Sequence, residues 1–210
     1  MLQLKFPTCF TGFTECTVAG DPEYKTFDKM KHNFEGTHSY VLVQTKNLPS
    51  NLPEIYIEGT NVCNDHDKKN GQSSKDNVNS HDDDDDDDDD DIEEESNRSQ
   101  ELKIKVYNIT VALKQKCKVF VNGQKMRTPV SPSPGLNIRK KSSHIYVKTD
   151  FGLTVKFGGH CKAVITLPNF YKRRVVGLCG NFDGRKGNDQ IKLDGTMAHN
   201  TQEFGDSWIV

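Results

Sequence analysis

Residues 102–125 contain the stretches Leu102-Lys-Ile-Lys-Val106, Ile109-Thr-Val-Ala-Leu113 and Lys118-Val-Phe-Val-Asn-Gly-Gln-Lys125. In the first two, every second residue is apolar, which is the pattern of a β-strand with one buried face. A one-residue slip separates them and indicates a β-bulge. In the third, Asn122-Gly123 suits the positive φ angles of a tight type I′ turn, so it predicts a hairpin.

The same alternation continues outward from this stretch in both directions. It recurs around Val41 and Val43, around Ile55 and Ile57, and in 145–148, 153–157 and 162–167. Pro129, Pro132 and Pro134 with Gly135 predict a loop, and no helical period of useful length precedes residue 190. The sequence therefore predicts a mostly β body with antiparallel strands, as a sandwich or an open barrel.

One polar segment interrupts this pattern. Residues 82–95 hold ten Asp and three Glu, so the remaining 28 basic and 17 acidic residues leave the rest of the chain at about +11, although the whole chain is at −2. Ten adjacent carboxylates repel one another and offer no core. We therefore expect residues 64–100 to be a disordered insertion, either solvated or acting as an electrostatic arm.

Cysteine usage bears on the compartment. Six cysteines, without any C-x-x-C pair, favour three disulfides in an extracellular setting; the alternative is six buried thiols in a cytosolic protein. Asn97 and Asn108 begin glycosylation sequons. The sequence contains no run of 18 apolar residues, so it predicts no membrane span. The N-terminus lacks the apolar stretch of a secretory signal, so an extracellular chain would be a fragment or use another route.

The usual catalytic motifs are missing. The sequence has no G-x-S-x-G elbow, no H-E-x-x-H and no phosphate-binding glycine loop, so we expect no catalytic residues. The basic clusters 139–141 and 172–174 lack interleaved aromatic residues, which makes them solvated faces and not a nucleic-acid site.

Residues 179–189 are rich in oxygen donors. Asn181, Asp183, Asn188 and Asp189 offer hard ligands among glycines that let the loop curl, and calcium takes such ligands. The spacing is not that of an EF-hand. The alternative is a turn-rich loop capped by its own Asn and Asp side chains.

Five separated motifs resemble the von Willebrand factor type D domain, in the form found in zonadhesin, IgG Fc-binding protein and the tectorins. The first is Cys16-Thr-Val-Ala-Gly-Asp-Pro-Glu-Tyr-Lys-Thr-Phe-Asp28. The others are 36–42, 150–157, 177–184 followed by Asn188-Asp189, and 203–208. The resemblance covers 16–210 outside the insertion, which makes residues 1–15 the remnant of an upstream segment.

The resemblance implies a mostly β, antiparallel two-sheet module that is sandwich-like, with calcium bound near its C-terminal end. Carried over, the calcium ligands are Asp21, Asn181, Asp183, the carbonyl of Arg185, Asn188 and Asp189. It also implies a Cys16–Cys179 disulfide. Cys117 and Cys161 stand where relatives usually lack cysteine, so we expect them to form a pair particular to this chain.

The resemblance implies a non-catalytic extracellular adhesion or matrix module, whose partners are extracellular glycoproteins or matrix proteins. Membrane tethering would come only through a larger parent protein. Glu23 replaces the histidine needed for self-cleavage, and Val176 replaces the second thiol needed for disulfide exchange. The alternative function is an acidic calcium-buffering or mineral-interacting secreted protein that uses the Asp tract.

Overall fold

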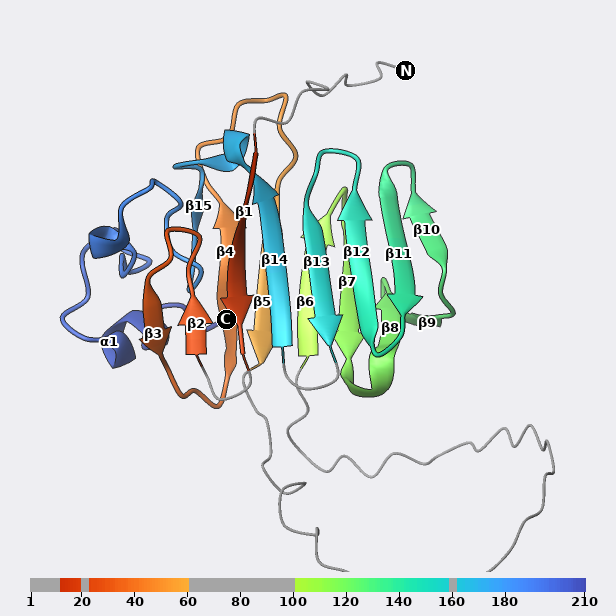
Figure 1. The fold of residues 1–210 in the computed structure, drawn as a ribbon, viewed down its shortest axis with the longest axis horizontal. Coiled ribbons are helices and arrows are strands. Elements are labelled where there is room, and N and C mark those ends of the chain that lie inside the picture. Colours follow the sequence, from red (N-terminus) through yellow and green to blue (C-terminus); the bar gives the residue numbers. More distant parts are fainter. Residues whose placement is uncertain (1–11, 20–22, 61–100, 159–161) are drawn as a thin grey trace, which may run out of the picture.

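The computed structural model describes residues 12–19, 23–60, 101–158 and 162–210. Two antiparallel sheets lie face to face in it (Figure 1). In order across the sheet, the eight-stranded sheet contains β10 (Val130–Ser133), β11 (Leu136–Lys141), β12 (His144–Thr149), β13 (Thr154–Gly158), β14 (Lys162–Pro168), β1 (Phe13–Val18), β2 (Glu23–Lys25) and β3 (Lys31–Asn33). The seven-stranded sheet contains β15 (Val175–Val176), β4 (Ser39–Thr45), β5 (Tyr56–Thr60), β6 (Glu101–Val106), β7 (Ile109–Lys114), β8 (Lys118–Val121) and β9 (Gln124–Met126). The expected two-sheet, mostly β fold is confirmed.

The core lies between the two sheets. Alternate side chains of each strand point inward, so Val147 and Ile165 of one sheet and Ile57 and Val111 of the other are fully buried. Removing apolar surface from water is the main force that holds such layers together. No helix within the described segments has the length and hydropathy needed to cross a membrane.

The Asn122-Gly123 hairpin is confirmed, whereas the predicted bulge at 107–108 is wrong. Val106 pairs with Ile109, so β6 and β7 are two antiparallel strands joined by Tyr107 and Asn108, whose φ angles are 52° and 59°. Within each strand every second residue faces inward, but across the two-residue turn the inward-facing Val106 and Ile109 are three positions apart. In the sequence this spacing looks like a one-residue slip in a single strand.

The prediction of a loop in the proline-rich segment is also wrong, because Val130–Ser133 forms the edge strand β10. Proline cannot donate a hydrogen bond, but an edge strand has one side without a neighbour, and Pro132 is tolerated there. The expected insertion, 64–100, lies wholly outside the described residues, and the expected N-terminal remnant, 1–15, lies largely outside them. The strands on either side of the insertion, β5 and β6, are paired neighbours.

The C-terminal segment returns to the N-terminal half of the chain. The amide of Val41 donates to the carbonyl of Trp208 (2.9 Å), and the amide of Cys179 donates to that of Leu42 (3.0 Å). Gly177 allows this approach, because its φ is 122° and a Cβ there would lie 2.6 Å from the Leu42 carbonyl oxygen. The short helix α1 (Thr201–Asp206) then lies beside β3 (Figure 1).

Candidate metal centre beside a buried disulfide

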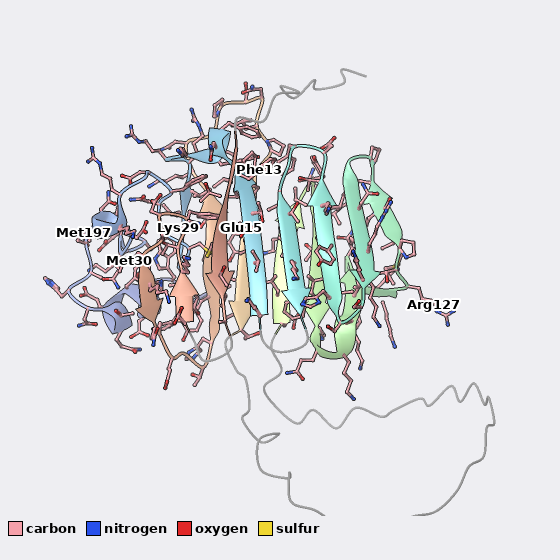
Figure 2. The ribbon with its side chains drawn as sticks, in the orientation of Figure 1. Phe13, Glu15, Lys29, Met30, Arg127 and Met197 are labelled. Atoms are coloured by element: carbon pink, nitrogen blue, oxygen red, sulfur yellow. A yellow bond between two sulfur atoms is a disulfide. The ribbon has the colours of Figure 1, made fainter. Side chains whose placement is uncertain are left out.

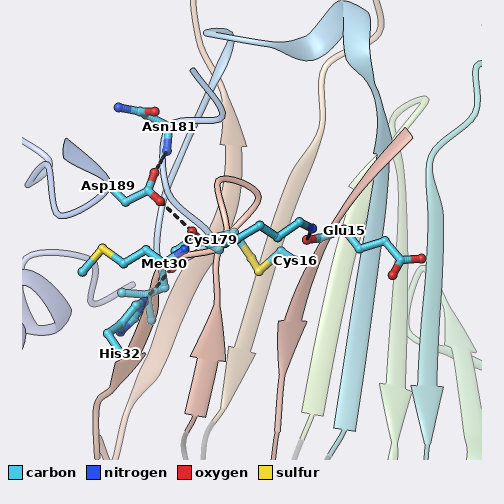
Figure 3. The surroundings of a disulfide bond; sticks show 10 residues. Glu15, Cys16, Met30, His32, Cys179, Asn181 and Asp189 are labelled. Atoms are coloured by element: carbon cyan, nitrogen blue, oxygen red, sulfur yellow. Dashed lines mark hydrogen bonds between the residues drawn. A yellow bond between two sulfur atoms is a disulfide. The ribbon is translucent and has the colours of Figure 1, made fainter. Parts of the chain in front are cut away.

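A disulfide joins the first described strand to the loop after β15. Cys16 in β1 bonds to Cys179, 163 residues away, and both side chains are fully buried (Figure 3). The Cα atoms are 5.7 Å apart, within the usual range for a disulfide. The expected pairing is confirmed. It fixes the start of the loop 179–189 next to β1.

Two carboxylates hold this loop against the turn that follows β2. Asp28 accepts hydrogen bonds from the amides of Asp183 and Gly184, both at 2.8 Å. Asp189 accepts from the hydroxyl of Thr26 (2.6 Å) and from the amide of Asn181 (3.2 Å). Figure 3 shows the Asn181–Asp189 bond beside the disulfide. Segments more than 150 positions apart in the sequence therefore meet here.

Asp28 and Asp189 are buried close together, which is unfavourable when both carboxylates carry a negative charge. Asp28 and Asp189 are 8% and 2% exposed. Burial raises the pKa of Asp189 to about 6; the negative charge of Asp28 adds to the rise, while the hydrogen bonds from Thr26 and Asn181 oppose it. Within the described residues, neither carboxylate forms an ion pair with a lysine or arginine. A cation would relieve this repulsion.

The donor set fits calcium. Besides the carboxylates of Asp28 and Asp189, the loop 179–189 offers the side-chain oxygen of Asn188, which is buried and has no hydrogen-bond partner among the described residues. Asn181 and Asp183 add further oxygens to the same loop. Calcium takes about six to eight such oxygens and tolerates irregular geometry. No group of three or more Asp, Glu, His or Cys side chains poised for a metal occurs in the described segments, so a calcium ion here would also need amide oxygens as ligands.

Part of the loop also matches the alternative of self-capping. Asp183 accepts from the amide of Arg185 (2.8 Å) and from the side-chain amide of Asn188 (2.9 Å). These short-range bonds are typical of Asx turns. They account for Asp183, but they leave the buried Asn188 oxygen without a partner and the negative charge of Asp28 and Asp189 without a counter-ion among the described residues.

The predicted ligands are only partly assembled by the structure. Asn181, Asp183, Asn188 and Asp189 lie together, the side chain of Arg185 is exposed, and Asp21 lies outside the described residues. Asp28, the acid that reaches the loop, is not among the predicted ligands. Nothing in the motif itself distinguishes Asp28 from Asp21, and the packing of the adjacent Phe27, which is 1% exposed, is apparent only in the fold.

Two other predictions concern Cys117 and the sequons. Cys117 carries a free thiol in the turn Gln115–Cys117, between β7 and β8, so the structure does not contain the expected Cys117–Cys161 bond. Cys161 lies outside the described residues, between β13 and β14 in the sequence. Asn97 also lies outside them, whereas Asn108 is exposed at the β6–β7 turn.

Comparison with known proteins assigns the chain to a protein family. The model of the von Willebrand factor type D domain matches residues 16–85 and 85–196. The chain belongs to that family. Zonadhesin of Sus scrofa is 34% identical over 196 residues, which is 93% of this chain and 7% of that protein.

Two further relatives support the assignment to the type D domains. The IgGFc-binding protein of Homo sapiens is 33% identical over 199 residues, which is 94% of this chain and 3% of that protein. Alpha-tectorin of Gallus gallus is 27% identical over 208 residues, 99% of this chain and 8% of the relative. This type D domain therefore spans less than a tenth of each of these relatives.

Proposed function

We propose that this type D domain is a non-catalytic extracellular adhesion or matrix module, stabilised by a structural calcium ion and by the Cys16–Cys179 disulfide. The observation that carries the proposal is the meeting of Asp28 and Asp189 beside that disulfide, at a site where buried negative charge lacks a described counter-ion. The name zonadhesin supports the adhesive role by analogy with a relative. Partners would be extracellular glycoproteins or matrix proteins, and any membrane tether would belong to a larger parent protein.

The ion would be held by Asp28, Asp189, Asn188, Asn181 and Asp183. Calcium supplies positive charge where two carboxylates converge, and it would clamp the β2–β3 turn to the C-terminal loop. Extracellular calcium modules bind at roughly 10⁻⁴–10⁻³ M, so this ion would be permanently bound outside the cell. Its role would be to keep the β2–β3 turn and the loop 179–189 in one rigid body.

Catalysis by thiol–disulfide exchange has no support here. Val176 occupies β15 at the position where a second, resolving cysteine would stand, and Cys179 is already bonded to Cys16. Exchange needs one thiol to attack and another to release the mixed disulfide. The purified protein should therefore fail to accelerate the reduction of insulin.

The test of the calcium proposal is thermal unfolding with calcium and with chelator. We expect calcium to raise the Tm of the wild type. Asp28→Asn and Asp189→Asn should melt near the chelator value in both conditions. Asp194→Asn is the matched control, because Asp194 is an exposed acid in the same C-terminal region and lies outside the proposed site. Identical melting of the wild type with and without calcium would remove the ion from the proposal.

The adhesive role is tested with beads that carry the secreted protein. We expect them to bind surfaces coated with extracellular glycoproteins, and we expect the Asp28→Asn variant to bind less after chelation or warming. Beads that never bind such surfaces, although the protein on them is folded and oxidised, would refute the adhesive role while leaving the calcium site intact.

A further inference from the structure

The outer face of the eight-stranded sheet carries a dense set of basic side chains. Figures 1 and 2 look onto this face. From β11 to β14 the outward positions include five basic residues, which we call the basic face: Arg139, Lys141, Lys148, Lys156 and Lys162. The strands β10 to β14 contain no Asp or Glu.

The register brings these charges close to one another. Arg139 pairs with Tyr146, which pairs with Lys156 on the next strand. Neighbouring strands lie about 4.8 Å apart, so the residues of one such row are close neighbours. The Lys156 ammonium lies 5.9 Å from the centre of the Tyr146 ring. The face thus consists of basic groups around a central, half-buried tyrosine.

Three lysines elsewhere in the described residues are neutralised by carboxylates. Lys31 pairs with Glu23 (2.9 Å), Lys103 with Glu58 (3.3 Å) and Lys192 with Glu203 (2.6 Å). No member of the basic face pairs with a carboxylate of the described residues. Glu15 of β1, labelled in Figure 2, is an outward acid of the same sheet, and it accepts a hydrogen bond from Thr166 of β14. Concentrated charge of one sign attracts a ligand of the opposite sign.

The shape of the face favours an extended ligand. A shallow hollow of about 600 Å³ crosses β11 and β12 and is lined by Asn137, Arg139, Lys140, Lys141, Tyr146 and Lys148. A second hollow adjoins it and shares Arg139 and Lys140. The charges extend over four strands, far beyond one small anion.

We infer that the basic face binds a linear sulfated polysaccharide of the extracellular matrix. Arg and Lys donate charge-assisted hydrogen bonds to the oxygens of anionic groups, and a polyanion releases bound counter-ions on contact. The choice of a sulfated glycan rests on the proposed extracellular function. Single-stranded nucleic acid is disfavoured because stacking requires several aromatic side chains, and the outward positions of β11 to β14 offer only the rings of Tyr146 and His144.

The experiment measures heparin binding by the full chain at several salt concentrations. The test variant is Arg139→Gln/Lys148→Gln/Lys156→Gln. The control, Lys46→Gln/Lys116→Gln/Lys125→Gln, removes the same charge from exposed positions outside the face. At about 0.15 M salt we expect the test variant to lose about tenfold or more in affinity, and its salt dependence to fall by about two charges. The control should stay near wild type, and both variants should keep the wild-type Tm.

Three outcomes would overturn the inference. The first is a wild type that does not bind heparin at physiological salt, and the second is an equal loss in the control variant. The third is equally tight binding of duplex DNA or polyaspartate at matched charge, which would show a preference for another class of polyanion. A protein whose unfolding responds to calcium but which ignores heparin would refute this inference alone, while the proposed function would stand.

Discussion

His32 is a buried imidazole between aromatic rings. It stacks on Tyr24 with ring centres 4.8 Å apart and meets the edge of Phe204 at 5.4 Å. Its Nε2 lies 3.0 Å from the carbonyl oxygen of Leu178, which identifies Nε2 as the protonated nitrogen of the neutral ring. Burial lowers the pKa of His32 below its ordinary value of 6.5, although the bond to Leu178 opposes this.

This burial predicts a loss of stability in acid. Between the lowered folded pKa and 6.5 the unfolded chain binds more protons than the folded chain, so the free energy of unfolding falls as the pH falls through that range. Lowering the pH from about 7.5 to about 5.5 should therefore reduce the Tm more in the wild type than in His32→Phe. The exposed His38, replaced by Asn, is the control and should keep the wild-type dependence. Parallel pH profiles for wild type and His32→Phe would contradict the prediction.

At the same scale, Asp28 shows what the sequence could not provide. Motif spacing was enough to gather Asn181, Asp183, Asn188 and Asp189, because they share one short loop. Which acid approaches from the N-terminal half depends on the turn after β2, where Lys29 has a φ of 69°. That geometry is set by tertiary packing around Phe27, and the local sequence does not report it.

At the scale of elements, the two tight turns of the seven-stranded sheet show where sequence signals hold and fail. Asn122-Gly123 is the residue pair that positive φ angles favour. Tyr107-Asn108 adopts the same conformation, but tyrosine rarely does so. Its cost is offset by a hydrogen bond from the Tyr107 hydroxyl to Asp150 and by an edge contact with Phe151, both from the opposite sheet. A local pattern cannot reveal a turn that distant residues stabilise.

The helix α1 gives an element-scale prediction. The side chain of Asn200 accepts from the amide of Glu203 (2.9 Å), and the helix buries Phe204 against His32. Replacing Asn200 by Ala removes this cap and should cost about 1 kcal/mol of stability. For a domain of this size that is a Tm decrease of about 2–4 °C, measurable by calorimetry. Asn200→Asp restores an acceptor and should stay close to wild type; an equal decrease there would show that the cap is not the cause.

At the scale of the whole molecule, the polar segment between β5 and β6 should be dispensable for folding. Thr60 and Glu101 are already joined, since the Thr60 hydroxyl accepts from the Glu101 amide at 3.1 Å. Replacing residues 62–99 by a short Asn-Gly turn shortens the connection about tenfold and lowers the loop-closure cost by about 2 kcal/mol. We expect an unchanged or higher Tm. Unfolded or aggregated protein would show that the segment contributes to the fold.

The disulfide and the proposed calcium ion connect the same two parts of the molecule. Cys16 and Asp28 belong to the strands β1 to β3 and their turns, while Cys179 and Asp189 lie at the two ends of one loop. By the chain-entropy argument, closing a loop of this length contributes at most about 5 kcal/mol, and typical disulfides give about 2–4 kcal/mol. Without the bond, calcium must itself order the loop against the turn, so its affinity should decrease.

This coupling is measured in a cycle of four melting curves. Wild type and Cys16→Ala/Cys179→Ala are each unfolded with calcium and with chelator. We expect the variant to melt lower in both conditions, and we expect calcium to raise its Tm by less than in the wild type, because stabilisation by a ligand decreases as its Kd increases. Equal increments would mean that the ion and the disulfide act as independent tethers. By reciprocity, coupling would also make the disulfide harder to reduce when calcium is bound, which is measured as the equilibrium fraction of reduced protein in a glutathione redox titration.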